Sequence, residues 1–598
     1  MNKLIIILSL AGIATSLTAT AQDDNLNKEI VVEKDYTPIE QKASKLSLVP
    51  PVVQFEPAAS NLTFSMRNSP VATGNQIPTL PAYGYLTQYI KTDPRGYLNF
   101  SMGSYFNING AAGFNIIDTK KSKLAIFVGH ASTAGANSDI RKYFPSYLVD
   151  NTQIPTIKQR WNDEHAGLNY RQKIGNLLLY SDATYSYSGT RAFSNTESSH
   201  STIKGNDVDL KLGIDNISGA ALSYNANITF NYFDYNVSNY TPAVKSTQTY
   251  LKLDGGVGSR VHDKYKAGID LGFEYMSTNN NPNKTNIGLL KMTPYYGKLK
   301  GAFTYKLGLN LDMSFNDGRF FNVSPQVNAK YKFTNGFSVY GIATGGKHFN
   351  RMFDTASQNR YTLVYGLGNT SMTQVNAQVG FLVGPFNGFK MKIYGGYESV
   401  KNSNIPTNIK FKYNNISGTD LVMTLSEYGD YGTLDLSGFM WGADISYNYF
   451  NLVDFYFGIK NTHQNSEGSN YSFGYDRPEW VLDTRIGINP IPKLHIDLGY
   501  EWRGNRRIGA YYYNPQPVSS ISTFQVSSIS TFQSKSRHFT CIDLLDVSNV
   551  WVRTSYRINY LLEVNLQATN LLNKGWHVMD IYSNQGIAIM GGIALQFK

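Results

Sequence analysis

Residues 303–315 read FTYKLGLNLDMSF, and this stretch decides the fold class. Every second position, from Phe303 to Phe315, is apolar or aromatic, and the positions between them hold Thr, Lys, Gly, Asn, Asp and Ser. Successive side chains of a strand point to opposite faces, so this strand would have one oily face and one polar face. A tilted strand needs about 9–11 residues to cross the hydrocarbon of a bilayer, and this segment is long enough.

The same alternation recurs along the chain, for example in residues 265–275 and 494–503, and it continues to the C-terminus. Strands of a soluble β-sandwich alternate too, but they average about 5–6 residues, so the lengths here favour a membrane barrel.

The connections between these segments are alternately short and long. Short ones include residues 118–122 and 489–493. Outer-membrane barrels of bacteria have short periplasmic turns and long external loops. The predicted fold class is therefore all-β: a transmembrane antiparallel β-barrel of about 22 strands, with both ends in the periplasm. The long connections are 132–162, 190–204, 348–370, 401–430 and 504–546.

Strands inside a bilayer must also close into a cylinder. An unpaired backbone N–H or C=O in lipid costs several kcal/mol, because no water can replace its partner. The final segment, Ile587–Phe597, alternates apolar residues and ends on an aromatic ring. We therefore expect it to pair with a strand near Tyr97–Tyr105 and close the barrel.

Composition excludes several other classes of protein. Only 16% of the residues are charged and 14% are aromatic, and the mean hydropathy of −0.30 is too low for a bundle of membrane-spanning helices. The net charge is +11, but Lys and Arg are scattered, which indicates a basic periplasmic rim and lumen rather than a nucleic-acid surface. The single cysteine, Cys541, allows no intramolecular disulfide and no cysteine-based zinc cluster.

The N-terminus indicates export. Residues 1–21 hold Lys3, an apolar run and small residues up to Ala19-Thr20-Ala21, which is the pattern of a signal peptide with its cleavage site. Residues 22–95 are rich in proline and predict an extended periplasmic arm. The barrel then occupies residues 96–598, and the expected location is the outer membrane.

The sharpest resemblance to a known family is at the end of the chain. The stretch Leu566–Lys574, LQATNLLNK, is followed by a glycine-rich apolar strand and resembles the closing hairpin of TonB-dependent receptors. The resemblance implies a 22-stranded outer-membrane transporter that binds or moves a solute with energy from a TonB-type periplasmic partner. Members of that family close their lumen with a globular N-terminal plug domain.

A short segment of the arm is the candidate partner-binding site. Its residues are Glu29, Ile30, Val31, Val32 and Glu33. They are similar to the TonB box, which in the family adds as a strand to the sheet of the energy-transducing partner. The arm is too short and too rich in proline to fold as the family's plug, so the chain more nearly resembles plug-less relatives. The arm, folded loops or a partner would then have to fill a wide lumen.

No motif supports catalysis or a cofactor. Residues 341–348, GIATGGKH, approach a phosphate-binding loop, but the position that requires Ser or Thr holds His348. The nine histidines form no zinc-binding pattern and no serine stands out as a nucleophile, so we expect no enzyme activity, no cofactor and no metal. Residues 511–513, three consecutive tyrosines, could stack on a sugar or form part of an interfacial girdle.

Charged residues on the polar faces can be interpreted in two ways. They could line a solute path, or they could pair across strands in the lumen, which is the interpretation we favour. The residues concerned are Lys266, Asp270, Glu274, Asp497, Glu501 and Arg503.

Together these patterns favour a receptor-like barrel for solute uptake or ligand binding at the cell surface. The alternative is a structural or interaction barrel that anchors a periplasmic or secretion assembly and transports nothing. Expected partners are outer-membrane lipid, a TonB-type periplasmic protein, a surface lipoprotein and a solute of unknown class. Nucleic acid is not expected.

Overall fold

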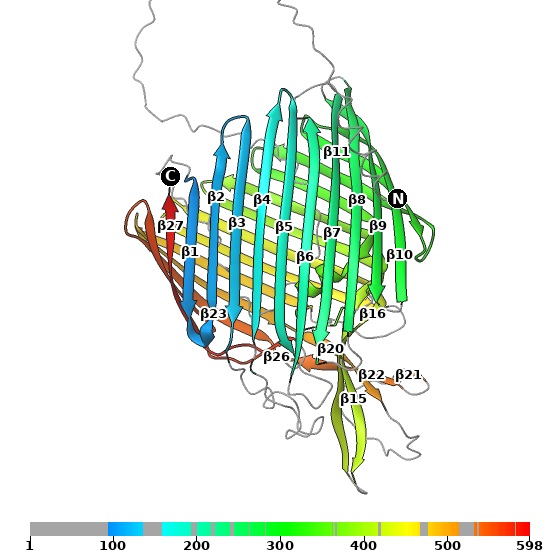
Figure 1. The fold of residues 1–598 in the computed structure, drawn as a ribbon. Coiled ribbons are helices and arrows are strands. Elements are labelled where there is room, and N and C mark those ends of the chain that lie inside the picture. The colour runs from blue at the N-terminus through cyan, green and yellow to red at the C-terminus, as the bar shows by residue number, and fades with distance from the viewer. Residues whose placement is uncertain are drawn as a thin grey trace, which may run out of the picture. The chain divides into compact units, whose positions relative to one another are not determined.

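An antiparallel sheet that closes on itself dominates the computed structural model (Figure 1). The structure describes residues 94–135, 158, 160–192, 200–216, 222–239, 244–261, 264–280, 283–361, 363–364, 367–416, 420–466, 477–513, 532–534, 537–579 and 582–597. These residues belong to one compact unit, Asn68–Lys598. The predicted signal peptide, nearly all of the arm and the candidate segment Glu29–Glu33 lie outside the described residues.

Twenty-two strands form the wall, as predicted. In order around the barrel they are β1 (Gly96–Gly103), β2 (Ile108–Asp118), β3 (Ser122–Thr133), β4 (Trp161–Ile174), β5 (Leu177–Ala192), β6 (Ser201–Asn216), β7 (Leu222–Ser238), β8 (Val244–Val261), β9 (Tyr265–Asn280), β10 (Asn283–Lys298), β11 (Phe303–Phe315), β12 (Phe321–Thr334), β13 (Phe337–Asn350), β14 (Asn369–Phe386), β15 (Phe389–Ile416), β16 (Asp420–Tyr449), β17 (Val453–Ser466), β18 (Trp480–Ile491), β19 (Leu494–Gly504), β23 (Val547–Arg557), β24 (Leu562–Thr569) and β27 (Ala588–Phe597).

The remaining elements belong to the connections. A short 3-10 helix, η1 (Ser104–Phe106), joins β1 to β2, and the helix α2 (Met352–Gln358) lies between β13 and β14. Between β19 and β23 come β20 (Arg506–Tyr513), β21 (Phe532–Ser534) and β22 (Arg537–Leu544). Between β24 and β27, β25 (His577–Met579) and β26 (Tyr582–Ser583) form a separate two-stranded sheet.

The first and last strands close the barrel, as the C-terminal pattern predicts. β1 and β27 run antiparallel, with Gly96 opposite Phe597 and Gly103 opposite Met590. The Phe597 ring stacks on Phe114 of β2 at 6.1 Å between ring centroids. Every strand of the wall therefore has a partner on both sides, which lipid requires.

The two ends of the barrel have different connections, again as predicted. At one end the strands are joined by turns such as 118–122 and 334–337, and the chain enters β1 and leaves β27 there. This is the periplasmic end, and the long connections lie at the opposite, extracellular end.

Two of the predicted long loops are wrong in detail. Residues 401–430 lie mostly within β15 and β16, and residues 504–546 contain β20 to β22. The reason is that both hairpins continue their backbone ladders beyond the barrel, where β20 joins β15 in parallel, with Ile409 opposite Ala510. Figure 1 shows these strands projecting from the extracellular end. The three tyrosines at 511–513 lie in β20, and their predicted stacking or interfacial role stays untested because their side chains are not described.

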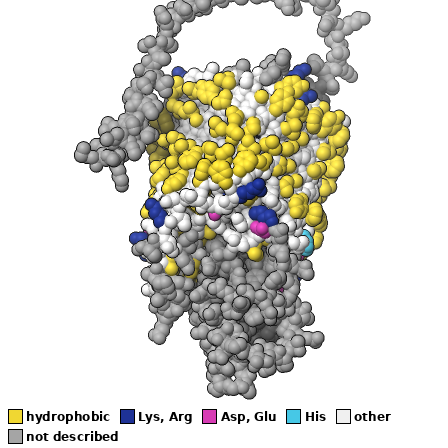
Figure 2. Space-filling view, turned by 90° about the vertical axis from the view of Figure 1, so that its right-hand side faces the viewer, with side chains coloured by type: hydrophobic (Ala, Val, Ile, Leu, Met, Phe, Trp, Pro, Cys, Tyr) yellow, Lys and Arg dark blue, Asp and Glu magenta, His cyan; other side chains and the backbone are white. Residues whose placement is uncertain are grey.

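A broad band of hydrophobic side chains covers the outer wall, with lysine and arginine side chains at its borders (Figure 2). It consists of outward residues such as Leu271, Leu307 and Leu309, which are exposed in the isolated protein. Aromatic rings lie at its periplasmic edge, where Tyr265 stacks on Tyr296 at 5.9 Å. A belt of this kind is the lipid-facing surface of an outer-membrane barrel. In the described part of the chain, no helix has both the length and the apolar character needed to span a bilayer.

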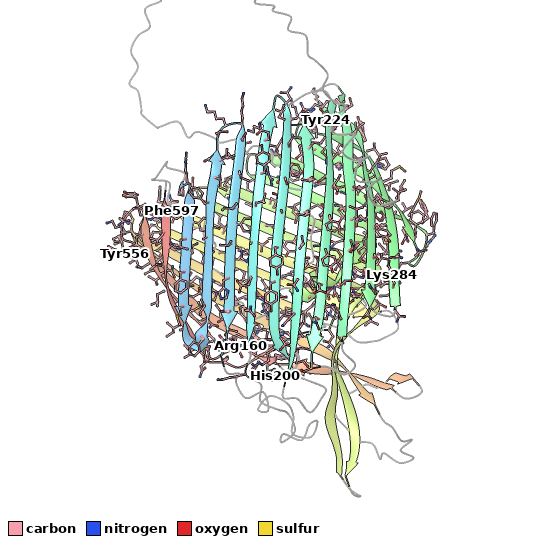
Figure 3. The ribbon with its side chains drawn as sticks, viewed as in Figure 1. Arg160, His200, Tyr224, Lys284, Tyr556 and Phe597 are labelled. Carbon is pink, nitrogen blue, oxygen red and sulfur yellow. The ribbon has the colours of Figure 1, made fainter. Side chains whose placement is uncertain are left out.

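The polar faces of the strands point into the lumen, where charged residues pair between strands. Figure 3 shows side chains on both faces, with Tyr224 near the periplasmic end and Arg160 and His200 near the extracellular end. This arrangement supports cross-strand pairing, the interpretation favoured from the sequence. The ion pairs between strands include Lys291–Glu274 (2.7 Å), Lys306–Asp270 (3.3 Å) and Arg503–Asp483 (2.7 Å).

Candidate functional site in the barrel lumen

The connection between β13 and β14, residues 351–368, turns into the lumen. Gln248 of β8 fixes its backbone at two points. The Met352 N–H donates to Gln248 Oε1 (2.8 Å), and Gln248 Nε2 donates to the Leu367 carbonyl oxygen (2.9 Å). Met352 and Val364 have 0% of their surface exposed. The described part of this loop is therefore packed interior, unlike an ordinary loop on a protein surface.

Apolar residues on the inner faces of neighbouring strands support the loop. Phe353 of α2 meets the edge of the Phe233 ring of β7 at 5.7 Å. Arg351 forms two 2.7 Å hydrogen bonds with Asp354 and lies 4.8 Å from the Tyr250 ring. Near the extracellular end, the inner face is thus a hydrophobic core. A buried cluster beside the loop comprises Tyr250, Met276, Ile287, Leu289 and Phe349.

A second connection, residues 570–587 between β24 and β27, also packs inside. Asn570 Nδ2 donates to the carbonyl oxygens of Lys574 and Gln585, both at 2.9 Å. Gln585 in turn accepts a 3.0 Å hydrogen bond from Asn107 Nδ2 and donates one of 2.8 Å to Thr133 Oγ1. These bonds tie the segment to Asn107, directly before β2, and to Thr133 at the end of β3. Both residues lie near the place where β1 pairs with β27.

The two connections meet across the lumen. The Tyr361 ring stacks on Tyr582, with 3.7 Å between ring centroids and 13° between the planes. Next to it, Arg360 contacts Asp163 of β4 through two nitrogens (2.8 and 3.4 Å) and lies 4.1 Å from the centre of the Trp161 ring. We call the described residues of 351–368 and 570–587 the crossbar. Its wall contacts run from β7 and β8, which hold residues 351–368, past β4 to β3, which holds residues 570–587, near the extracellular end.

The crossbar groups hold particular protonation states. Burial raises the pKa of Tyr361 to about 12, more than the neighbouring Arg360 guanidinium lowers it. Burial alone would lower the pKa of Arg351, but its hydrogen bonds to the Asp354 carboxylate outweigh burial and raise it. At neutral pH the crossbar therefore contains a neutral phenol at the stack and a charged Arg351 beside Tyr250.

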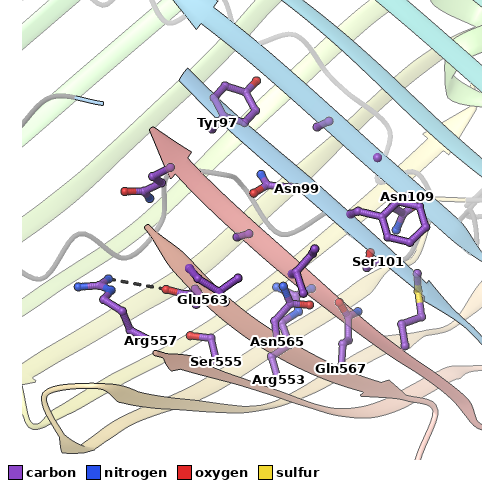
Figure 4. A pocket seen from close by; sticks show the side chains of 18 of the residues that line it. Tyr97, Asn99, Ser101, Asn109, Arg553, Ser555, Arg557, Glu563, Asn565 and Gln567 are labelled. Carbon is purple, nitrogen blue, oxygen red and sulfur yellow. Dashed lines mark ion pairs between the residues drawn. The ribbon is translucent and has the colours of Figure 1, made fainter. Parts of the chain in front are cut away.

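We call the strands around the β1–β27 pairing the seam wall. On the periplasmic side of the lumen, this wall lines a polar cavity of about 320 Å³ (Figure 4). Two arginines, Arg553 and Arg557, and two carboxylates, Asp497 and Glu563, line it together with amide side chains. Arg557 Nη2 lies 3.7 Å from Glu563 Oε2. The lining offers both donors and acceptors and almost balanced charge, which suits a polar solute better than an apolar one. The amide side chains are those of Asn99, Asn109, Asn559, Asn565, Gln567 and Gln596.

The structure brings few of the sequence-predicted residues together. Asp497 lines the cavity, whereas Lys266, Asp270 and Glu274 lie on β9, away from the seam wall. Glu501 is opposite Asp483 in the β18–β19 ladder and is not part of the cavity. Among the described residues, no group of three or more His, Cys, Asp or Glu could hold a metal ion.

Sequence reasoning missed the crossbar and the two cavity arginines. Arg360 and Tyr361 lie in residues 348–370, which were expected to form a long external connection, and no prediction was made for the connection that holds Tyr582. One signal was available: in residues 233–237, FDYNV, the inward positions are apolar and the outward ones polar, the reverse of the membrane pattern. Such a reversal indicates that something apolar packs inside the barrel beyond the membrane.

A closed 22-strand barrel with an apolar belt and material inside its lumen defines the class of large outer-membrane receptors. The chain is an outer-membrane barrel that shares the fold of TonB-dependent receptors.

Solved structures of such receptors share the fold. The ferric enterobactin receptor of Pseudomonas aeruginosa (a mutant) superposes with a TM-score of 0.58 and 11% identity, covering 84% of this chain and 80% of that one. The siderophore receptor PirA of Acinetobacter baumannii gives 0.57 and 10%, covering 85% and 81%. The pyoverdine receptor FpvA of Pseudomonas aeruginosa, bound to pyoverdine, gives 0.57 and 10%, covering 84% and 79%.

At this level of identity the likeness establishes the fold only. It does not show that this chain binds the ligands of those receptors. No family model matches the chain, and no curated protein matches it in sequence.

Proposed function

We propose that the protein is a cell-surface receptor that admits a polar solute through its lumen, with the crossbar as the extracellular closure. The observation that carries this proposal is the Tyr361–Tyr582 stack, through which two connections from separate parts of the chain meet inside the barrel. The polar cavity on the periplasmic side would then receive the solute after it passes the crossbar.

The contacts at the meeting point suit a closure that can open. One aromatic pair contributes about 0.5–1.5 kcal/mol beyond its buried area, and the Arg360–Asp163 pair is accessible enough to exchange with water. Each half of the crossbar is held more firmly to its own part of the wall, through Gln248 on one side and through Asn107 and Thr133, which hydrogen bond with Gln585, on the other. Separation at the stack would open a path while both halves stay folded.

The test is conductance of the purified protein in planar bilayers and solute flux into proteoliposomes. Tyr361→Ala with Tyr582→Ala should raise single-channel conductance several-fold. Tyr296→Ala, which removes a lipid-facing ring of the same kind, should leave it unchanged. Equal conductance of the crossbar variant and the unmodified protein, with the barrel still resistant to unfolding in cold SDS, would refute the closure role.

Energy input is the second part of the proposal. A TonB-type partner would add the strand Glu29–Glu33 to its own sheet, as a β-augmentation contact. Deletion of residues 22–40 should abolish concentrative uptake and capture of the partner, but leave the conductance in bilayers unchanged. Uptake that persists after this deletion would show that no such partner drives the protein.

An interaction role is the second candidate, and the projecting strands favour it. β15 and β16 extend over 28 and 30 residues, well beyond the length that a membrane requires, and β20 adds a parallel strand. This sheet would serve as a docking site for a surface lipoprotein. Replacement of residues 405–430 by a short turn should remove co-purification of that lipoprotein while heat-modifiable migration of the barrel persists. Unchanged co-purification would discard this candidate.

A further inference from the structure

A groove on the lipid-facing wall is independent of the lumen. It has a volume of about 750 Å³ and runs across β4 to β10. Its floor is a pair of small residues, Ala226 of β7 and Gly255 of β8, which lie opposite each other in the ladder. Large side chains stand on either side of the floor, including Leu212 (55% exposed) and Leu271 (51% exposed). The floor lies deeper than the surrounding lipid-facing surface because two small residues are adjacent there, while the neighbouring outward positions hold leucine, isoleucine and phenylalanine.

The groove is inclined to the plane of the membrane. On β5 its lining residue Leu179 is two positions from the periplasmic end of the strand, whereas on β9 Leu271 is six positions from that end. Leu290 on β10 is eight positions from the periplasmic end. At about 3.3 Å per residue along strands tilted by about 40°, the deep end lies roughly 15–20 Å from the rim. That is about one leaflet of a hydrocarbon core that is about 30 Å thick.

The shallow end of the groove reaches polar and basic groups. Tyr170 lines the groove, and its hydroxyl donates to Gln172 Oε1 (3.0 Å). One residue further, the Lys173 N–H donates to the Lys121 carbonyl oxygen (2.7 Å), so the β2–β3 and β4–β5 turns lie side by side.

The two turns together carry a surplus of positive charge. Lys120, Lys121 and Lys173 are exposed there, while the acidic residue of these turns, Asp118, pairs with Lys123 at 3.2 Å. Lys173 is on the same face of β4 as Arg171, which pairs with Asp182 in the lumen, so an anionic group at the membrane surface would meet the two turn lysines, Lys120 and Lys121, beside the groove.

We propose that this groove binds one anionic phospholipid of the periplasmic leaflet, with an acyl chain on the Ala226–Gly255 floor and the phosphate beside Lys120 and Lys121. The two halves of the site match the two halves of the lipid: an apolar channel one leaflet deep, and a cationic cluster at the headgroup level. An apolar segment of another protein would use the groove but not the lysines, and an acidic protein would use the lysines but not the groove.

The test measures lipid retained by the full-length protein after detergent extraction, by native mass spectrometry, following reconstitution with phosphatidylglycerol or phosphatidylcholine. We expect one tightly retained phosphatidylglycerol and at least fivefold less phosphatidylcholine. Ala226→Leu fills the floor and should reduce retention of both lipids. Ala343→Leu is the matched control on β13, where the alanine also faces outward, opposite Val327 and Ala377, and it should retain lipid normally.

A charge variant tests the headgroup end. Lys120→Gln with Lys121→Gln should reduce the preference for phosphatidylglycerol to near unity, while Lys300→Gln in the exposed β10–β11 turn should not. Equal retention of both lipids by the unmodified protein would overturn the proposal. It would also fail if Ala226→Leu retained phosphatidylglycerol as the unmodified protein does, because the lysines would then act without the groove. Heat-modifiable migration in SDS gels confirms that each variant still forms a barrel.

Discussion

The extracellular and periplasmic halves of the lumen are built from the same strands but have opposite chemistry. Near the extracellular end the inner face is apolar, and Met276 and Leu289 pack beside the crossbar with almost no exposed surface. Further along the same strands the inner face is charged, with Lys306 and Asp270 paired at 3.3 Å. The difference shows that the strand alone does not fix the character of the lumen. It depends on whether another part of the chain covers the inner face there.

The two halves also differ in how much their contacts stabilise the closed state of the lumen. Contacts in the extracellular half bury apolar surface, so substitutions there should release the crossbar. Pairs in the periplasmic half are partly exposed to the lumen, and such pairs contribute little to stability. Substitutions there should change what the lumen binds and leave the closure intact.

The largest effect is expected for Met352→Asp, because this side chain is fully buried against the barrel wall. An unpaired buried charge should destabilise the docked loop by about 3–5 kcal/mol. External protease should then cleave residues 351–368 in whole cells, with the barrel still heat-modifiable. Ser357→Asp, an exposed position on the same helix, is the control and should stay resistant. Resistance of Met352→Asp would mean that the apolar packing does not hold the loop.

The second effect is a loss of closure at alkaline pH. Because burial raises the pKa of Tyr361 to about 12, from about 10 in an undocked loop, docking is favoured fully below pH 10 and loses this contribution as the pH rises to 12. The difference of about two pH units corresponds to roughly 3 kcal/mol. Conductance should rise between pH 10 and 12. Tyr361→Phe keeps the ring but has no proton to lose, so its conductance should rise less over that range. An equal rise in the two proteins would show that ionisation of Tyr361 does not cause the opening.

A smaller effect is expected for Arg360→Lys. Lysine keeps the charge but cannot contact Asp163 through two nitrogens or lie flat on Trp161, so closure should weaken by about 1–2 kcal/mol. The open probability in bilayers measures this change, and Arg319→Lys at an exposed turn is the control. No difference between the two variants would show that the geometry of the arginine is unimportant.

The smallest effect on stability is expected for Arg557→Gln in the periplasmic-side cavity. Its 3.7 Å contact with Glu563 is long and partly exposed, so unfolding in SDS should change by less than about 1 kcal/mol. Solute flux through a crossbar-open background should nevertheless change its preference between anionic and cationic solutes. An unaltered preference would remove the cavity from the solute path.

Much of the wall could be predicted from the sequence because lipid imposes a simple rule. Segments such as 265–275, 303–315 and 494–503 lie in strands as expected, since an oily face and a polar face can be read directly from alternation. The pairing of Ile587–Phe597 with the first strand followed from the same requirement, because an open sheet edge cannot remain in a membrane.

The crossbar could not be predicted, because nothing local marks a loop that packs inside. Tyr361 and Tyr582 are more than two hundred residues apart and become neighbours only when the barrel is closed. The continuation of β15 and β16 past residue 401 was missed for a related reason: polar residues such as Asn402 and Asn404 look like a loop, although outside the membrane a strand needs no apolar face. The role of Glu29–Glu33 stays a prediction, since it depends on a partner and not on the fold.

Pairing of β1 with β27 has a consequence for biogenesis. β1 can pair on both sides only after the last dozen residues of the chain have been synthesised. In a shortened product, the backbone groups at one edge of β1 stay unpaired. Any truncation, from a premature stop or a proteolytic nick before residue 588, leaves a ribbon with two unsatisfied borders. The β1–β27 pairing therefore distinguishes full-length molecules from truncated ones, because only full-length molecules can form a closed barrel.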